Sequence, residues 1–222
     1  MKGYGTYMKI IDLTHFISED MPVYPGTEGP KFTPANSYEK DGFKETLITM
    51  YTHTGTHMDP PAHLFASRTT LDQFPIEQFV GSALVIDCSN IKEGQRITMD
   101  YVRQYGEKAD QAEFLLFRTG WEQYWGTEKY FGNYPYISNE VADYLISTHK
   151  KGIGLDVIGL DPIADMNLTL HKRLFQESEI VIIENMMNLH LIGSNLFTLC
   201  ALPLKHIDAD GSPIRAIALI EM

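Results

Sequence analysis

The sequence predicts a single mixed α/β domain, and three observations support this fold class. Short apolar runs typical of β-strands recur along the 222 residues, and helical patterns lie between several of them. The runs after mid-chain are continuously apolar, which indicates a sheet buried on both faces. No internal repeat, low-complexity tract or Ser/Gly linker divides the chain, so one domain accounts for its length.

The individual elements follow from local pattern. The expected strands are Leu47–Tyr51, Ala83–Asp87, Phe114–Arg118, Ile153–Asp156, Ile180–Glu184 and Ile214–Ile220, and the expected helices are Met99–Tyr105, Asn139–Lys150 and Leu168–Gln176. Ser138 is a good N-cap for the second helix, and Gly152 is its expected stop. The Pro-rich segment Met21–Pro34 is expected to be an irregular loop.

The domain is expected to span residues 9–222. A core pattern first appears at residues 9–13, whereas residues 1–8 are rich in Gly and Tyr and are expected to form a disordered lead. They lack the apolar centre of a signal peptide, and no apolar run approaches the roughly 20 residues of a membrane span.

Composition excludes several classes of partner. The chain carries 29 acidic and 18 basic residues, a net charge of −11, and has no basic cluster. Nucleic acid and anionic membranes are therefore not expected as partners. Its two cysteines, Cys88 and Cys200, lie in apolar contexts and fit free thiols in a reducing compartment, so we expect a cytoplasmic protein.

The segment from His53 to His63 carries the strongest functional signal. It reads His-Thr-Gly-Thr-His-Met-Asp-Pro-Pro-Ala-His and holds three of the eight histidines of the chain. In an extended backbone His53, His57, Asp59 and His63 would project from the same side, because successive side chains alternate. Imidazole nitrogens and a carboxylate that converge on one point are typical ligands of a divalent transition metal. The alternative is a polar loop whose histidines are satisfied locally.

Two later residues could complete such a site. His171 falls within the third expected helix, and Glu184 ends the apolar strand Ile180–Glu184. A buried glutamate at that position needs a partner, which could be a cation or an arginine. The remaining histidines have no comparable neighbours and are expected to be structural or surface residues.

Other hydrolase signatures are absent from the sequence. It contains no His-Glu-x-x-His motif, no Cys-x-x-Cys pair, no Gly-rich phosphate loop before a helix and no Gly-x-Ser-x-Gly elbow. The simplest nucleophile for a hydrolase of this kind is a metal-bound hydroxide.

The His53–His63 segment resembles the His-x-Gly-Thr-His-x-Asp-x-Pro-x-His signature of the cyclase-like metal-dependent hydrolases, a family that contains bacterial kynurenine formamidases and isatin hydrolases. The resemblance extends over nearly the whole chain. Further pieces occur in family order: Asp12–Thr14, Met21–Gly26, Arg118–Trp121, Gly154–Asp156, Asp161-Pro162, His171, Glu184-Asn185, Ala201–Leu204 and Asp210–Ala216.

The resemblance implies a swivelling β/β/α-type domain that assembles into a homodimer or homotetramer. It also implies a metal centre, commonly two zinc ions per subunit and in some members manganese. By position, the implied ligands are His53, His57, Asp59, His171 and Glu184, with Asp59 and Glu184 able to bridge two ions. His63 is the implied general acid/base.

The implied activity is hydrolysis of N-formyl-L-kynurenine or a related aryl formamide to formate and an amine. Tyr24 occupies a position where kynurenine formamidases typically carry Trp, which weakens that substrate assignment. Aromatic walls suit a flat aryl group, so Tyr24, Phe65, Trp121 and Tyr124 are candidates for the pocket, with core packing as the alternative. Other readings are hydrolysis of a cyclic amide or lactone, as in isatin hydrolase, and a non-catalytic metal-binding or cupin-like protein.

Overall fold

The computed structural model describes residues 7–221. Residues 1–6 of the expected lead lie outside this range, and the first strand already begins at Met8. The strands are β1 Met8–Asp12, β2 Lys31–Asn36, β3 Glu45–Thr49, β4 His57–Asp59, β5 Val80–Asp87, β6 Arg96–Ile97, β7 Phe114–Arg118, β8 Tyr136–Ile137, β9 Gly152–Leu155, β10 Val181–Glu184, β11 Phe197–Pro203 and β12 Ser212–Glu221. The α-helices are α1 Tyr38–Asp41, α2 Met99–Arg103, α3 Glu107–Gln111, α4 Asn139–Ser147 and α5 Thr169–Glu177.

The main sheet is mixed and almost closes on itself. Its strand order is β1-β12-β11-β5-β7-β9-β10-β4, and β12 also pairs with β4. Seven strands therefore form a barrel-like ring, with β1 added beside β12. Strands β5, β7, β9 and β10 run parallel, while β4, β11 and β12 pair antiparallel. The buried strands β9 and β10 agree with the buried sheet that the apolar runs after mid-chain indicated.

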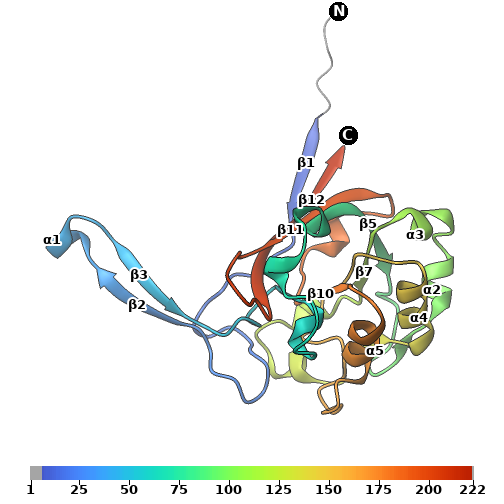
Figure 1. Cartoon of the computed structure of the whole chain (residues 1–222), viewed down its shortest axis with the longest axis horizontal. Helices are drawn as coiled ribbons and strands as arrows, with labels where there is room; N and C mark the ends of the chain where they lie inside the picture. The colour runs from blue at the N-terminus through green and yellow to red at the C-terminus, as the bar shows by residue number, and fades with distance from the viewer. Residues whose placement is uncertain (1–6, 222) are drawn as a thin grey trace, which may run out of the picture.

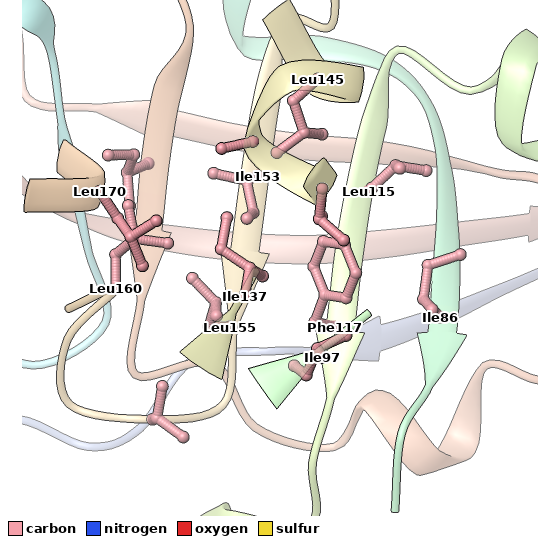
Figure 2. Packing of buried hydrophobic residues seen from close by; sticks show 14 of the residues in the cluster. Ile86, Ile97, Leu115, Phe117, Ile137, Leu145, Ile153, Leu155, Leu160 and Leu170 are labelled. Atoms are coloured by element: carbon pink, nitrogen blue, oxygen red, sulfur yellow. The ribbon is translucent and has the colours of Figure 1, made fainter. Parts of the chain in front are cut away.

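Each parallel strand contributes to two cores because its side chains alternate between the faces of the sheet. One core lies between the sheet and helices α2 to α5, on the right of Figure 1. Figure 2 shows part of this core, with Leu115 and Phe117 of β7 beside Ile153 and Leu155 of β9. The other core fills the inside of the ring and includes Phe114 and Leu116. Nearly every residue of β7, β9 and β10 is buried.

Several element boundaries differ from expectation. Ser138 does cap α4 by accepting a hydrogen bond from the amide of Val141, but the helix stops at Ser147. His149 then adopts a positive φ of 51°, so Gly152 is free to begin β9 instead of ending the helix. The segment expected to be irregular up to Pro34 enters β2, where the hairpin edge and a bulge between Pro34 and Asn36 accommodate the proline.

The hairpin β2–β3 is set apart from the rest of the fold. It extends away from the sheet and carries α1 at its tip (Figure 1). Every residue of β3 is exposed. Elsewhere in the described residues both cysteines are free, Cys88 buried and Cys200 partly exposed, and no helix reaches the length and apolar character of a membrane span.

Candidate metal centre

Strand β4 positions the centre of the site. His57 and Asp59 are alternate residues of this strand, so both side chains face the same way, while Met58 between them is buried in the interior core. β4 pairs antiparallel with β10 and sets His57 directly opposite Glu184. A strand of three residues, paired with β10 on one side and β12 on the other, thus brings a histidine and two carboxylates together.

Two turns of the backbone, one on either side of β4, bring His53 and His63 to the same point. The segment was expected to be extended from His53 to His63, but only residues 57–59 form a strand. Gly55 turns the chain before β4 with a φ of 65°, and Pro61–His63 forms a short 3-10 helix after it. The prolines that break the strand start that helix, since proline suits a first helical turn. As a result, the His53 ring lies 4.0 Å from the His63 ring, centroid to centroid.

Helix α5 delivers His171 from the opposite side. Its Nδ1 atom is 2.6 Å from Oδ2 of Asp161, and the Asp161 carboxylate also accepts hydrogen bonds from the amides of Leu170 and His171. Asp161 therefore caps the first turn of α5 and orients the histidine ring at once. The Nε2 atom of His171 is left facing Asp59 and Glu184.

The two buried carboxylates lie between the imidazoles. Oδ1 of Asp59 is 2.7 Å from Nδ1 of His53 and 3.3 Å from Nε2 of His57, whereas Oδ2 is 3.6 Å from Nε2 of His171. Glu184 does the same, with Oε2 at 3.5 Å from His57 Nε2 and Oε1 at 3.3 Å from His171 Nε2. Each carboxylate thus presents one oxygen to either side.

This donor set fits two divalent cations. Ligand atoms of His53, His57 and Asp59 lie within 4.8 Å of one another, as do those of Asp59, His171 and Glu184. We call these groups the His57 position and the His171 position; Asp59 belongs to both. Among the described residues neither Asp59 nor Glu184 pairs with a lysine or arginine, so the charge of these buried carboxylates is balanced only by histidines.

The titration of these groups agrees with a cation site. Burial disfavours a charged imidazole, but the neighbouring Asp59 and Asp210 carboxylates raise the pKa of His53 to about 9. Burial likewise opposes charge on His171, yet its hydrogen bonds to Asp161, Asp59 and Glu184 raise its pKa well above the usual value. The pKa of Asp59 is held low by the facing histidines despite its burial. Protons therefore occupy places that a metal would take, and binding would release them.

His63 differs from the other three histidines. Burial lowers its pKa below the usual value, so its ring is neutral at neutral pH. His53, His57 and His171 each have a ring nitrogen held by a hydrogen-bond partner, and among the described residues none holds the ring of His63. His63 lines the cavity beside the two cation positions, where a free imidazole can exchange protons.

A cavity of about 420 Å³ opens onto the site. Its walls are mainly apolar side chains beside the imidazoles, with Asp210 at 3.4 Å from Nε2 of His53. The apolar and aromatic lining consists of Pro22, Val23, Tyr24, Tyr51, Ile158, Met166 and Leu168. Of the four aromatic residues expected in a pocket, only Tyr24 lines this cavity.

The other three aromatic candidates lie elsewhere. Trp121 is buried, donates its indole N–H to the carbonyl of Tyr130 and packs edge-on against Tyr124. Phe65 and Tyr124 pack against the helix-side core. The turn after β7 directs Trp121 and Tyr124 toward the core, because Gly120 adopts a φ of 77° and Asp156 accepts hydrogen bonds from the amides of Thr119 and Gly120. Their placement does not match the expected pocket wall.

Three residues of the site had no assigned role in the sequence analysis: Asp161, Asn185 and Asp210. They appeared there only as parts of motifs in family order. Asp161 holds His171, Asn185 contacts the turn before His57, and Asp210 faces His53. Asn185 directly follows Glu184, but the three contacts themselves join residues that are 130, 10 and 157 positions apart, so no local spacing could reveal them.

Comparisons with known proteins agree with this geometry. A family model described as "Putative cyclase" matches residues 11–162. A kynurenine formamidase of Bacillus mycoides (strain KBAB4) is 31% identical over 208 residues, which cover 93% of this chain and 95% of that protein.

Solved structures share the fold. An isatin hydrolase bound to the product analogue thioisatinate superposes with a TM-score of 0.86 at 23% identity, covering 97% of this chain and 93% of that one. A structure titled as a potential metal-dependent hydrolase with cyclase activity has a TM-score of 0.74 at 27% identity and covers 97% of this chain and 100% of its own.

Proposed function

The chain belongs to the cyclase family of metal-dependent hydrolases, and from this premise we propose that it hydrolyses N-formyl-L-kynurenine or a related aryl formamide. The observation that carries the proposal is the pair of buried carboxylates, Asp59 and Glu184, each placed between His57 and His171 at the floor of an apolar cavity. The kynurenine formamidase relatives supply the substrate class.

The residues present would hold two Zn²⁺ ions per subunit, and Mn²⁺ suits the same mixture of imidazole and carboxylate ligands. His53, His57 and Asp59 would form one position; Asp59, His171 and Glu184 would form the other. Such ions, when bound, polarise a carbonyl and lower the pKa of water toward about 7. Asp59 and Glu184 keep the two positions adjacent because each carboxylate reaches both.

His63 supplies the proton transfer. Hydrolysis adds the hydroxyl group of water to the formyl carbon, breaks the C–N bond and returns a proton to the departing nitrogen. Because His63 is neutral at neutral pH and lines the cavity, it can accept the proton from water and deliver it to the amine. The products are formate and the free aryl amine.

The cavity wall suits an aryl group. Tyr24 and Tyr51 contribute aromatic rings to the lining, and Ile158, Met166 and Leu168 contribute apolar side chains. A flat ring between them would place its formamido group toward the histidines and carboxylates. Tyr24 would therefore contact the substrate, in agreement with the role that the sequence suggested for it.

The direct test is formate release from N-formyl-L-kynurenine by zinc-loaded protein, with metal-free protein and an isatin reaction measured in parallel. We expect metal-dependent turnover of the formamide. A His206→Ala variant provides a matched control, because His206 is exposed and lies outside the cavity. Firm metal binding without formamide turnover would overturn the substrate assignment, and turnover of isatin alone would replace it with cyclic amide hydrolysis.

A further inference from the structure

Two of the histidines at the site have their inner ring nitrogens fixed by different partners. Nδ1 of His57 is 2.8 Å from the backbone carbonyl of Gly55, and Nδ1 of His171 is 2.6 Å from the Asp161 carboxylate. A carbonyl oxygen can only accept a hydrogen bond, so Nδ1 of His57 carries the proton. In a ring with a single proton, Nε2 of His57 is then the nitrogen whose lone pair can bind a cation. The hydrogen bond to Asp161 has the same effect on His171.

The carbonyl that holds His57 is itself held by a buried chain of hydrogen bonds. Gly55 O accepts a second hydrogen bond from Nδ2 of Asn185, at 2.9 Å, and Oδ1 of Asn185 accepts one from the Tyr130 hydroxyl, at 2.7 Å. The two contacts fix the orientation of the amide, because its NH₂ group must face the carbonyl and its oxygen must face the hydroxyl. Tyr130 is fully buried.

Backbone geometry fixes the position of this series of hydrogen bonds. Gly55 and Asn185 both have positive φ values, 65° and 57°. Asn185 directly follows Glu184, its amide donates to the carbonyl of Val157, and its own carbonyl accepts a hydrogen bond from the Thr56 hydroxyl. Asn185 thereby fastens the end of β10 to the turn that precedes β4. Asparagine suits this role, since it tolerates the left-handed conformation better than most residues.

We infer that the two cation positions have separate positioning residues: Tyr130 and Asn185 act on the His57 position through Gly55, and Asp161 acts on the His171 position. The inference rests on the proposed metal centre and extends it. None of the three residues is a ligand or touches the reacting atoms. Each acts by fixing the direction of an imidazole, and the two sets share no hydrogen bond.

Two conservative variants separate the positions. Tyr130→Phe deletes only the hydroxyl that holds Asn185. Asp161→Asn keeps the size of the side chain. Both oxygens of Asp161 accept hydrogen bonds, one from Leu170 N and the other from His171 N and His171 Nδ1. In the variant the NH₂ group therefore faces a donor whichever way the amide turns. Loss of such a partner typically weakens metal binding by about 10- to 100-fold.

The experiment measures zinc affinity by competition with a chromophoric chelator, in two backgrounds that each retain one position. In His171→Ala protein, which keeps the His57 position, Tyr130→Phe should lower zinc affinity about 10-fold or more and Asp161→Asn should leave it unchanged. In His53→Ala protein, which keeps the His171 position, the pattern should reverse. Tyr144→Phe, which removes a hydroxyl bonded to Asp110 far from the site, controls for hydroxyl loss.

The readout distinguishes positioning from general stability. If the variants acted by loosening the whole fold, both would lower affinity in both backgrounds and in parallel with the melting temperature of the metal-free protein. That result would overturn the inference. So would an unchanged zinc affinity for either variant in the background where a loss is expected. Failure of the wild-type protein to bind zinc would instead overturn the proposed function, so the two failures are distinguishable.

Discussion

At the scale of single residues, the most informative contrast is among the four histidines of the site. The rings of three of them are held by hydrogen bonds, and among the described residues none holds the ring of His63. The short motif from His53 to His63 predicted most of the ligand candidates, because those residues are close in sequence and chemically conspicuous. Their supporting partners could not be predicted in this way. The contact of Asn185 with Gly55 depends on β10 being paired with β4, and the contact of Asp161 with His171 depends on the loop before α5 folding back onto the helix.

The free ring of His63 leads to the first prediction. His63→Ala should retain both ions and lose activity by at least about 100-fold, the usual contribution of general acid/base catalysis. Metal content and turnover, measured on the same preparation, check this. Because His53, His63 and Asp210 also form a possible cation group, loss of metal in this variant would make His63 a ligand and remove its assigned role.

The shared carboxylate gives the opposite expectation. Asp59→Ala should remove at least one ion per subunit, since Asp59 belongs to both cation positions and its two oxygens face different histidines. Elemental analysis after dialysis measures the stoichiometry. An unchanged content of two ions would contradict bridging by Asp59.

His15 provides a prediction on pH dependence. Its ring is buried in a stack on Trp125, 3.9 Å between centroids, and burial lowers the pKa of His15 to about 4. The unfolded chain, with a histidine pKa near 6.5, binds more protons between these values, so the free energy of unfolding should fall as pH falls from about 6.5 to about 4. This group alone accounts for about 3 kcal/mol over that range.

His15→Phe tests this directly, because phenylalanine keeps the stack and cannot take up a proton. Denaturant unfolding at several pH values should show the variant gaining stability relative to the wild type as pH falls. A constant difference across the range would mean that His15 does not titrate in this way.

At the scale of elements, how well the predicted bounds match the observed ones depends on the length and polarity of each segment. β7 has the predicted bounds, because five consecutive apolar or half-buried residues leave little ambiguity. β4 was hidden inside a longer expected extension, since three residues carry no period of their own. β11 was not predicted, although its buried residues Phe197, Leu199 and Ala201 alternate with more exposed ones, a pattern typical of a half-buried strand. Thr148 and His149 ended α4 earlier than its apolar pattern suggested.

The junction before β12 supports a prediction at this scale. A Cβ atom on Gly211 would lie 2.4 Å from Cε1 and 2.6 Å from Nε2 of the His53 ring. Gly211→Ala should therefore displace His53 and lower metal affinity at the His57 position, while the fold should persist because Gly211 is not among the glycines with positive φ. Metal titration combined with thermal melting separates the two effects. Wild-type affinity in this variant would show that His53 can move without cost.

At the scale of the whole molecule, the hairpin β2–β3 is the least self-sufficient part. Leu47 and Ile48 point to opposite faces of it and are 58% and 48% exposed. An isolated two-stranded hairpin is marginally stable in water. On the main sheet, Met8 and Ile10 of β1 are also exposed. The homodimer or homotetramer that the family resemblance implies stays a prediction, and we propose these surfaces as the place of its contacts.

Assembly is testable on the hairpin. The double variant Leu47→Ser, Ile48→Asn should shift the protein toward a monomer, because it removes apolar side chains from both faces without altering a core. Light scattering coupled to gel filtration measures the mass, and Thr49→Ser in the same strand is the matched control. A wild-type protein that is already monomeric would contradict the expectation.

The closure of the ring also has a consequence for biogenesis. β4 lies early in the chain and pairs with β10 and β12, and His53 contacts Asp210 across 157 positions of sequence. A ribosome must therefore synthesise the chain through Glu184 before all the candidate ligands exist, and through β12 before the ring can close. Contacts of such large sequence separation form slowly. For most of its synthesis the nascent chain carries the histidine motif without the strands that β4 pairs with. We therefore expect a cation to bind at the complete site only after the sheet has closed. Until then the histidine motif would be accessible to a chaperone or a metal buffer.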